Sequence, residues 1–447
     1  MTKKRFYGCL VPFTICVVLA CVLWVFILYN ASITAHKLEL ELAKLLSAEP
    51  STASSTPSDE NPDKTLEGNT EPVVIEENAA DLYEEAFALY SDERVDNLLE
   101  HTAIVWEKPL SEWTAEEVSR LRKILDRNSE IVDILLKVNS LEHCEFETVY
   151  DDNNIPSQPR SINPLEWRFF ANLLMGKSLL ACKDGDSDGA LRSCSQILRM
   201  SNHLANSDSI MGQLVRMAVS GIAFNTANGL LDEGEFSGVT VDEFIEVLDS
   251  SYQHDALVRG LKGERSYTIA VFDYRREKYS TPVGNWVVNK NELLYLDLMN
   301  RSIEPSRLPY YQAYESLKAC NEEAEMLSER RSGLDRVRRV FRFMGLMSFS
   351  TQLRVAMSQA EHETRLHLIR TTFELKKYKK DNGSYPEKLV SLAPDYIDKL
   401  TIDPFSGNSL LYRREKEGFV LYGVGENMKD DNAESKDDLD IVWHARR

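Results

Sequence analysis

Basic residues are scarce in this chain of 447 residues: 52 Lys and Arg stand against 71 Asp and Glu, for a formal net charge of -19. Such a surface repels phosphate backbones, because proteins hold DNA and RNA mainly through Lys and Arg. No nucleic acid is therefore expected among the partners. The remaining composition, 43% apolar and 28% charged, is that of a globular protein, and the length predicts roughly two or three domains.

Motifs that mark catalytic or metal sites are also missing. The sequence contains no Gly-rich phosphate loop, no Gly-x-Ser-x-Gly nucleophile elbow and no Cys-x-x-Cys pair. His362 and His367 resemble a zinc-protease helix, but they are five residues apart, about 140° around a helix, whereas two zinc ligands must be four apart. No catalytic residue is predicted.

A run of aspartates from Asp184 to Asp188 begins like an EF-hand calcium loop. The twelfth position of that loop must supply a bidentate Glu, and here it is Ser195. The same residues suit a turn between two helices, in which Asp186 or Ser187 caps the second helix. We therefore predict a helical hairpin at this position.

Charge is absent from residues 6–29. As a helix this stretch spans about 36 Å, enough to cross a hydrocarbon core of about 30 Å. Lys3, Lys4 and Arg5 precede it, which predicts a cytoplasmic N-terminus and a folded mass on the far side of the membrane. Two alternatives are a signal peptide cleaved near Ala31 and a lipoprotein at Cys21, but the apolar stretch is long for the first and continues beyond the cysteine for the second.

Four cysteines, Cys144, Cys182, Cys194 and Cys320, would then face an oxidising compartment in which disulfides form. They allow three pairings. Cys182 and Cys194 flank the predicted turn unequally, by about 4 and 8 residues, and the resulting axial offset of about 6 Å exceeds the usual disulfide reach. Disulfides and free buried thiols both remain open.

The chain divides into four parts. Residues 1–46 hold a cytoplasmic stub, the anchor and a short helix that continues from it. Residues 47–78 are rich in Ser, Thr, Pro and acids and predict a disordered linker that holds the folded part away from the bilayer. Residues 79–349 show helical periodicity and predict an all-helical domain of stacked hairpins, in which Ser111 or Thr114 caps a helix that extends to residue 138.

Residues 350–447 predict a small α+β domain. A long helix ends at Asn382-Gly383, a left-handed stop, and is followed by a turn at Asp403-Pro404. Leu410 with Tyr412, and Phe419 with Leu421, alternate as in two strands joined by a polar hairpin loop. The expected fold class is thus mainly α, with an antiparallel sheet laid on a long helix at the C-terminal end.

This order of segments, N-G-S-Y-P, then D-P-F-S-G-N-x-L-x-Y, then G-F-x-L-Y-G-V-G and a closing D-x-D-I, resembles the C-terminal domain of the major pseudopilin of type II secretion systems. The whole chain resembles membrane-anchored helical proteins of planctomycetes and related bacteria. The resemblance implies a bacterial inner-membrane protein with a periplasmic folded mass, linked to a secretion or pilus-like system. It also implies calcium bound by the acidic loop through Asp438 and Asp440. Asp430 and Asp431 could complete the oxygen ligands that calcium needs, and a solvated acidic loop is the alternative.

Taken together, the residues favour a non-enzymatic binding or scaffolding protein of the envelope with a protein partner there. The alternative is an extracytoplasmic enzyme, a hydrolase of envelope polymers with its site in the helical domain. Such an enzyme could use Glu264, beside Arg265, as an acidic group in a helical groove. The alternative is that the two residues form an ordinary ion pair on a helix.

Overall fold

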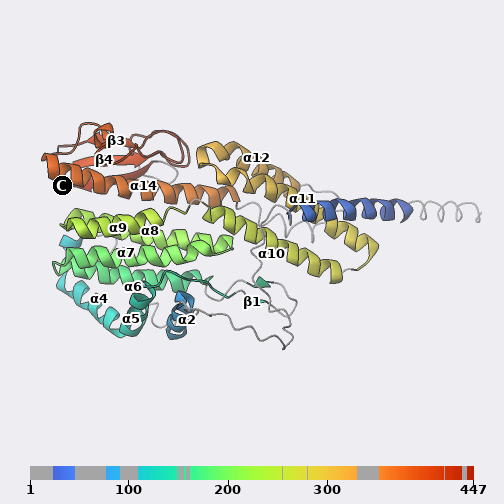
Figure 1. The fold of residues 1–447 in the computed structure, drawn as a ribbon, viewed down its shortest axis with the longest axis horizontal. Coiled ribbons are helices and arrows are strands. Elements are labelled where there is room, and N and C mark those ends of the chain that lie inside the picture. The colour runs from blue at the N-terminus through green and yellow to red at the C-terminus, as the bar shows by residue number, and fades with distance from the viewer. Residues whose placement is uncertain are drawn as a thin grey trace, which may run out of the picture.

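The computed structural model describes residues 24–45, 77–90, 109–147, 149–150, 156–157, 162–253, 255–278, 280–329, 352–416, 418–434 and 440–446. Within these ranges the chain is mainly helical, with a small three-stranded antiparallel sheet near its C-terminus (Figure 1). This confirms the expected fold class at that level. Residues 6–23 of the predicted anchor lie outside these ranges.

In the ranges just given, no helix combines the length and the apolar character that crossing a membrane requires.

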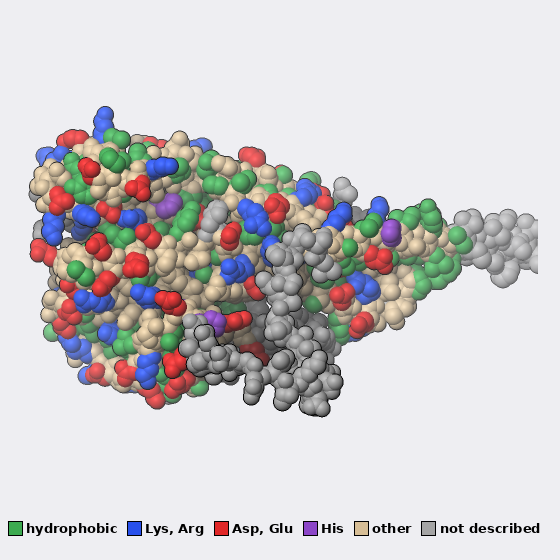
Figure 2. Space-filling view, in the orientation of Figure 1, with side chains coloured by type: hydrophobic (Ala, Val, Ile, Leu, Met, Phe, Trp, Pro, Cys, Tyr) green, Lys and Arg blue, Asp and Glu red, His purple; other side chains and the backbone are tan. Residues whose placement is uncertain are grey.

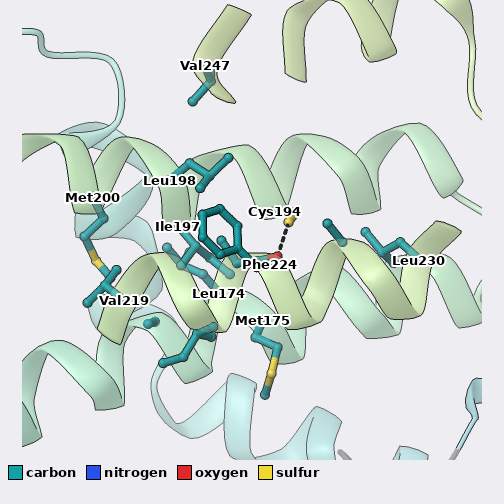
Figure 3. Packing of buried hydrophobic residues seen from close by; sticks show 14 of the residues in the cluster. Leu174, Met175, Cys194, Ile197, Leu198, Met200, Val219, Phe224, Leu230 and Val247 are labelled. Atoms are coloured by element: carbon teal, nitrogen blue, oxygen red, sulfur yellow. Dashed lines mark hydrogen bonds between the residues drawn. The ribbon is translucent and has the colours of Figure 1, made fainter. Parts of the chain in front are cut away.

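The first half of the helical body has one continuous core. Trp167, Phe169 and Phe170 are fully buried in it, and Figure 3 shows Leu174 and Ile197 near Phe224. The elements of this half are α2 (Ala79–Leu89), η1 (Leu110–Glu112), α4 (Ala115–Arg127), α5 (Ser129–Val138), β1 (Val149–Tyr150), β2 (Pro156–Ser157), α6 (Pro164–Lys183), α7 (Ser187–His203), η3 (Leu204–Asn206), α8 (Ile210–Glu233) and α9 (Gly238–Ser250).

Local capping explains where these helices begin. Thr114 accepts a hydrogen bond from the backbone N–H of Glu117, whose side chain accepts one from the backbone N–H of Thr114, so the predicted cap is confirmed as a capping box. The helix does not reach residue 138 unbroken, because Asn128 leaves helical geometry between α4 and α5. Asp186 accepts from the N–H of Gly189 at 2.8 Å, which confirms the predicted hairpin between α6 and α7.

The second half of the body consists of α10 (Ala256–Lys278), α11 (Pro282–Ile303), η4 (Pro305–Arg307) and α12 (Tyr310–Glu329). The helix of residues 24–45 lies beside α11 (Figure 1). Its Leu38 is 4% exposed in a core shared with Phe272, Val288 and Leu296, and Leu42 and Leu45 pack against the same core.

The residues that follow position 76 are hydrogen-bonded to the body as well. The backbone N–H of Ala79 donates to the carbonyl of His143 at 2.9 Å, and Asn78 exchanges two hydrogen bonds with the backbone of Glu145. Residues 46–76 thus connect two segments that both pack on the described body. Nearly all of the expected linker lies outside the described residues, and its disorder and its role as a spacer stay predictions.

The C-terminal module consists of α14 (Gln352–Asn382), η6 (Leu389–Leu392), β3 (Leu411–Arg414), β4 (Gly418–Gly423) and β5 (Ile441–Arg446). The strand order is β3-β4-β5, with Leu411 opposite Tyr422 and Trp443 opposite Leu421. Gly383 has φ +76, as the predicted helix stop requires. The hairpin of β3 and β4 was expected, whereas β5 was not.

Phe405 attaches this module to the helical body. It is 2% exposed, and its ring lies 5.2 Å from that of Tyr310 at the start of α12. The carboxylate of Asp403 holds the turn, because it accepts hydrogen bonds from the N–H groups of Phe405, Ser406 and Val424. α14 contacts α8, α9 and α12 as well as the sheet, so one helix belongs to both cores. The predicted boundary at residues 349–350 lies outside the described residues and stays a prediction.

Candidate functional site

A cleft of about 390 Å³ lies where α8, α14 and the C-terminal sheet meet, and we call it the junction cleft. Its walls come from segments that are up to about two hundred residues apart in the sequence. The described lining residues are Phe224, Asn225, Asn228, Met357, Glu361, Arg365, Leu368, Phe405, Gly425, Glu426, Asp440, Ile441, Val442 and Trp443.

The geometry of α14 explains why one helix can build a wall and a core at once. Met357, Glu361 and Arg365 are four residues apart and so project from one face. Leu366 and Ile369 of the same helix are buried on other faces. The face with Glu361 and Arg365 is thus the more exposed face of α14, and it lines the cleft.

Carboxylates outnumber cations among the lining residues that the structure describes. Glu361, Glu426 and Asp440 face a single guanidinium, that of Arg365, whose Nη2 is 2.7 Å from the carboxylate of Glu361. The cleft therefore carries a negative potential in a protein that is already acidic. It favours a ligand that brings a cation or several hydrogen-bond donors.

Asp440 is the most constrained of these carboxylates. It is 3% exposed and accepts hydrogen bonds from the N–H of Asp431 at 3.1 Å and of Ala433 at 2.8 Å. Burial raises the pKa of Asp440, and the two backbone donors partly offset that effect. Asn432 and Ala433 have φ values of 60° and 66°, a conformation in which successive N–H groups turn toward one acceptor.

One amide of the cleft has an unused acceptor. The Oδ1 atom of Asn228 on α8 is buried and has no hydrogen-bond partner among the described residues. A buried carbonyl oxygen of this kind costs free energy until a donor reaches it. Asn228 is therefore a natural contact for the donor group of a ligand.

A buried polar cluster backs the cleft. Arg216 is 0% exposed and donates to Gln359 at 2.7 Å and to Gln213 at 2.8 Å. Burial lowers the pKa of Arg216 to about 10. The ring of His362 lies 5.3 Å from that of Phe224, so the cluster is in contact with a cleft wall. We infer that it fixes the angle between α8 and α14 and thereby the width of the cleft.

The residues expected to hold calcium are divided between described and undescribed positions. Asp430 accepts from the hydroxyl of Tyr422 at 3.0 Å, and Asp431 accepts from the amide of Asn427 at 2.7 Å. Asp438 lies outside the described residues, among which no group of three or more His, Cys, Asp or Glu is close enough to hold a metal ion. Since the described carboxylates already accept hydrogen bonds from protein donors, calcium would have to compete for them, and the site stays a prediction.

The other residues considered from sequence lie away from the lining. Arg265 is 5% exposed and donates to Asn300 at 2.9 Å, and the backbone carbonyl of Glu264 accepts from the hydroxyl of Tyr295. His367 bonds the carbonyl of Ile402, so the two histidines have different surroundings.

The four cysteines that the structure describes, Cys144, Cys182, Cys194 and Cys320, are free thiols, which settles the alternatives left open. The thiol of Cys194 donates to the carbonyl of Ala223 at 3.3 Å (Figure 3). Burial raises the pKa of Cys144 to about 12 and also raises that of Cys194. Cys144 and Cys194 are therefore protonated core side chains.

Sequence reasoning reached the lining residues that lie in the quoted C-terminal segments, namely Phe405, Gly425, Asp440 and Ile441. Asn225, Asn228 and Glu361 carry no motif, and only the packing of α8 against the C-terminal module brings them together. Comparison of the chain with protein-family models, curated proteins and solved structures finds no match.

Proposed function

We propose that this protein is a membrane-anchored component of the bacterial envelope that binds an extended segment of a partner protein in the junction cleft. Residues 6–29 form the anchor, and the pseudopilin-like module of α14 and the sheet relates the protein to secretion or pilus-like systems. The observation that carries the proposal is the composition of the cleft: an excess of carboxylates between aromatic and aliphatic walls. A basic, partly apolar segment matches both properties.

The edge of the sheet supports an extended ligand. β5 pairs with β4 along one side, and no strand of the described chain pairs with its other side. Ile441, Val442 and Trp443 of this strand line the cleft, whose volume of about 390 Å³ lies within the range of known ligand sites. A partner segment that adds to such an edge gains main-chain hydrogen bonds and places alternate side chains in the cavity.

The hydrolase alternative draws little support from the cleft. Its described lining contains no Ser, Thr, Cys, His, Lys or Tyr that could act as a nucleophile. Carboxylates alone can hydrolyse glycosides, but they need one free acid and one free base. Of the three lining carboxylates, Glu361 pairs with Arg365 and Asp440 accepts hydrogen bonds from two backbone N–H groups, so two of the three are already engaged.

The proposal is tested with the full chain in nanodiscs and a library of extended peptides of varied charge and hydrophobicity. Peptides with basic and apolar residues should be enriched. Asn225→Arg, which fills the cleft from an exposed position on α8, should abolish the enrichment, while Ala218→Arg, exposed on the same helix outside the lining, should not.

A charge-reversal pair separates electrostatics from shape. Glu361→Lys and Glu116→Lys each break an exposed glutamate–arginine pair four residues apart, but only Glu361 lines the cleft. We expect weaker binding of basic peptides in the first variant alone. Equal loss in both variants, or no preference for basic peptides in the wild type, would contradict the proposal.

A further inference from the structure

The turn between α10 and α11 carries an unusual set of side chains, which we call the α10–α11 tip: Tyr274, Lys278, Val283, Trp286 and Lys290. Val283 is 39% exposed, and both lysines are exposed. Lys278 Nζ lies 5.5 Å from the centre of the Tyr274 ring, and Lys290 Nζ lies 5.7 Å from that of Trp286. Aromatic rings with lysine beside them are typical of the boundary between lipid and water.

The helix of residues 24–45 fixes where this tip lies. Leu38, Leu42 and Leu45 pack on the same core as Phe272 of α10 and Val288 of α11. Toward its start the helix runs on past the α10–α11 turn (Figure 1). The tip and the first turns of this helix therefore lie at the same end of the molecule.

The first turns of that helix are apolar and exposed. Trp24, Phe26 and Tyr29 are 49%, 61% and 65% exposed, and hydrophobic side chains gather at this end in Figure 2. They belong to the uncharged stretch of residues 6–29, whose last residue is Tyr29. An exposed apolar surface of this kind requires a lipid or protein cover.

We infer that the α10–α11 tip is a second membrane contact, which rests on the lipid surface beside the anchor; this rests on the proposed anchoring. If residues 6–29 cross the membrane, Tyr29 lies at its surface. The body packs on the next turns of the same helix and is therefore held close to the bilayer. Trp286 and Tyr274 then lie at headgroup level, and Lys278 and Lys290 reach anionic headgroups. Asp273 and Glu277 also lie at this end, and Asp273 is paired with Arg276.

Tryptophan quenching tests the inference in the full chain, reconstituted in nanodiscs whose lipids carry bromine near the headgroup. The difference in emission between the wild type and Trp286→Phe gives the emission of Trp286. The same difference for Trp443→Phe gives the emission of a tryptophan in the sheet and is the control. We expect brominated lipid to remove most of the Trp286 emission and to leave that of Trp443 unchanged. Equal quenching of the two would overturn the inference.

Trp24→Phe separates this inference from the anchor. If Trp24 is quenched and Trp286 is not, the anchor stands and the tip contact is wrong; if neither is quenched, both are wrong. Charge is tested with Lys290→Glu, which should weaken the quenching of Trp286 in anionic nanodiscs. Lys318→Glu is the matched control, since Lys318 lies 5.5 Å from the ring of Tyr314 on α12. The same quenching in both charge variants would refute contact with anionic headgroups.

Discussion

Replacement of Glu292 by glutamine should remove a large part of the pH dependence of stability in this protein. The side chain of Glu292 is 0% exposed on α11, where its carboxylate pairs with Arg276. Its Oε1 atom is buried without a hydrogen-bond partner among the described residues. Burial raises the pKa of Glu292 from its usual 4.5 to about 7, and the charge of Arg276 only partly opposes this.

The magnitude follows from the two pKa values. They differ by about 2.5, and one pKa unit corresponds to about 1.4 kcal/mol, so the full effect on stability is about 3.5 kcal/mol. Because the pKa is higher in the folded state, this contribution is complete below about pH 4.5 and is lost as the pH rises through 7. Glutamine does not titrate, so Glu292→Gln should lack this loss.

Pulse proteolysis in urea, with the full chain in detergent micelles at pH 5 and at pH 8, measures the free energy of unfolding at both pH values. The wild type should lose about 2.5 kcal/mol more than Glu292→Gln between them, because part of the effect is already lost at pH 5. Glu323→Gln is the control. Glu323 lies on α12, its side chain is 40% exposed, and it pairs with Arg301 on α11, the helix that carries Glu292. The reasoning is refuted if Glu292→Gln retains the pH slope of the wild type.

Four further outcomes are expected. Phe405→Ala should lower the free energy of unfolding by about 3 to 5 kcal/mol in urea titrations, because it empties the contact between module and body, whereas Ile402→Ala, at a residue 51% exposed, should cost less than about 1 kcal/mol. Thr114→Ala should cost about 1 kcal/mol in the same assay through loss of the capping box. Among the four described cysteines, native alkylation followed by mass spectrometry should label Cys182 first, since the other three thiols are buried. If the acidic loop binds calcium, a chelator should lower the melting temperature of the wild type but not of Asp440→Asn; no shift in the wild type would contradict the site.

Local signals in the sequence predicted local structure well. Thr114 and Asp186 correctly predicted where two helices begin. An N-cap depends only on one side chain and the backbone of the next few residues, so it can be read from a short stretch of sequence. The break at Asn128 was missed because the apolar period continues across it. β5 was missed because its partner β4 precedes it by a long acidic loop, not by a tight turn.

The junction cleft could not be predicted from sequence. Asn225, Glu361 and Trp443 are ordinary residues of a helix, a helix and a strand, and their meeting depends on how α14 packs between α8 and the sheet. A pattern within one element shows which of its faces is buried, but not which distant segment covers that face. The module itself was recognisable because its turn, hairpin and helix stop lie close together in the chain.

The acidic stretch of residues 46–76 leaves the body at Leu45 and returns to it at Asn78. Under the proposed anchoring, a pull on the lipid end would reach the body through the packing of Leu38, Leu42 and Leu45 against α10 and α11. We then expect that insertions or deletions within residues 46–76, and a reporter domain spliced there, leave the height of the described body above the bilayer unchanged.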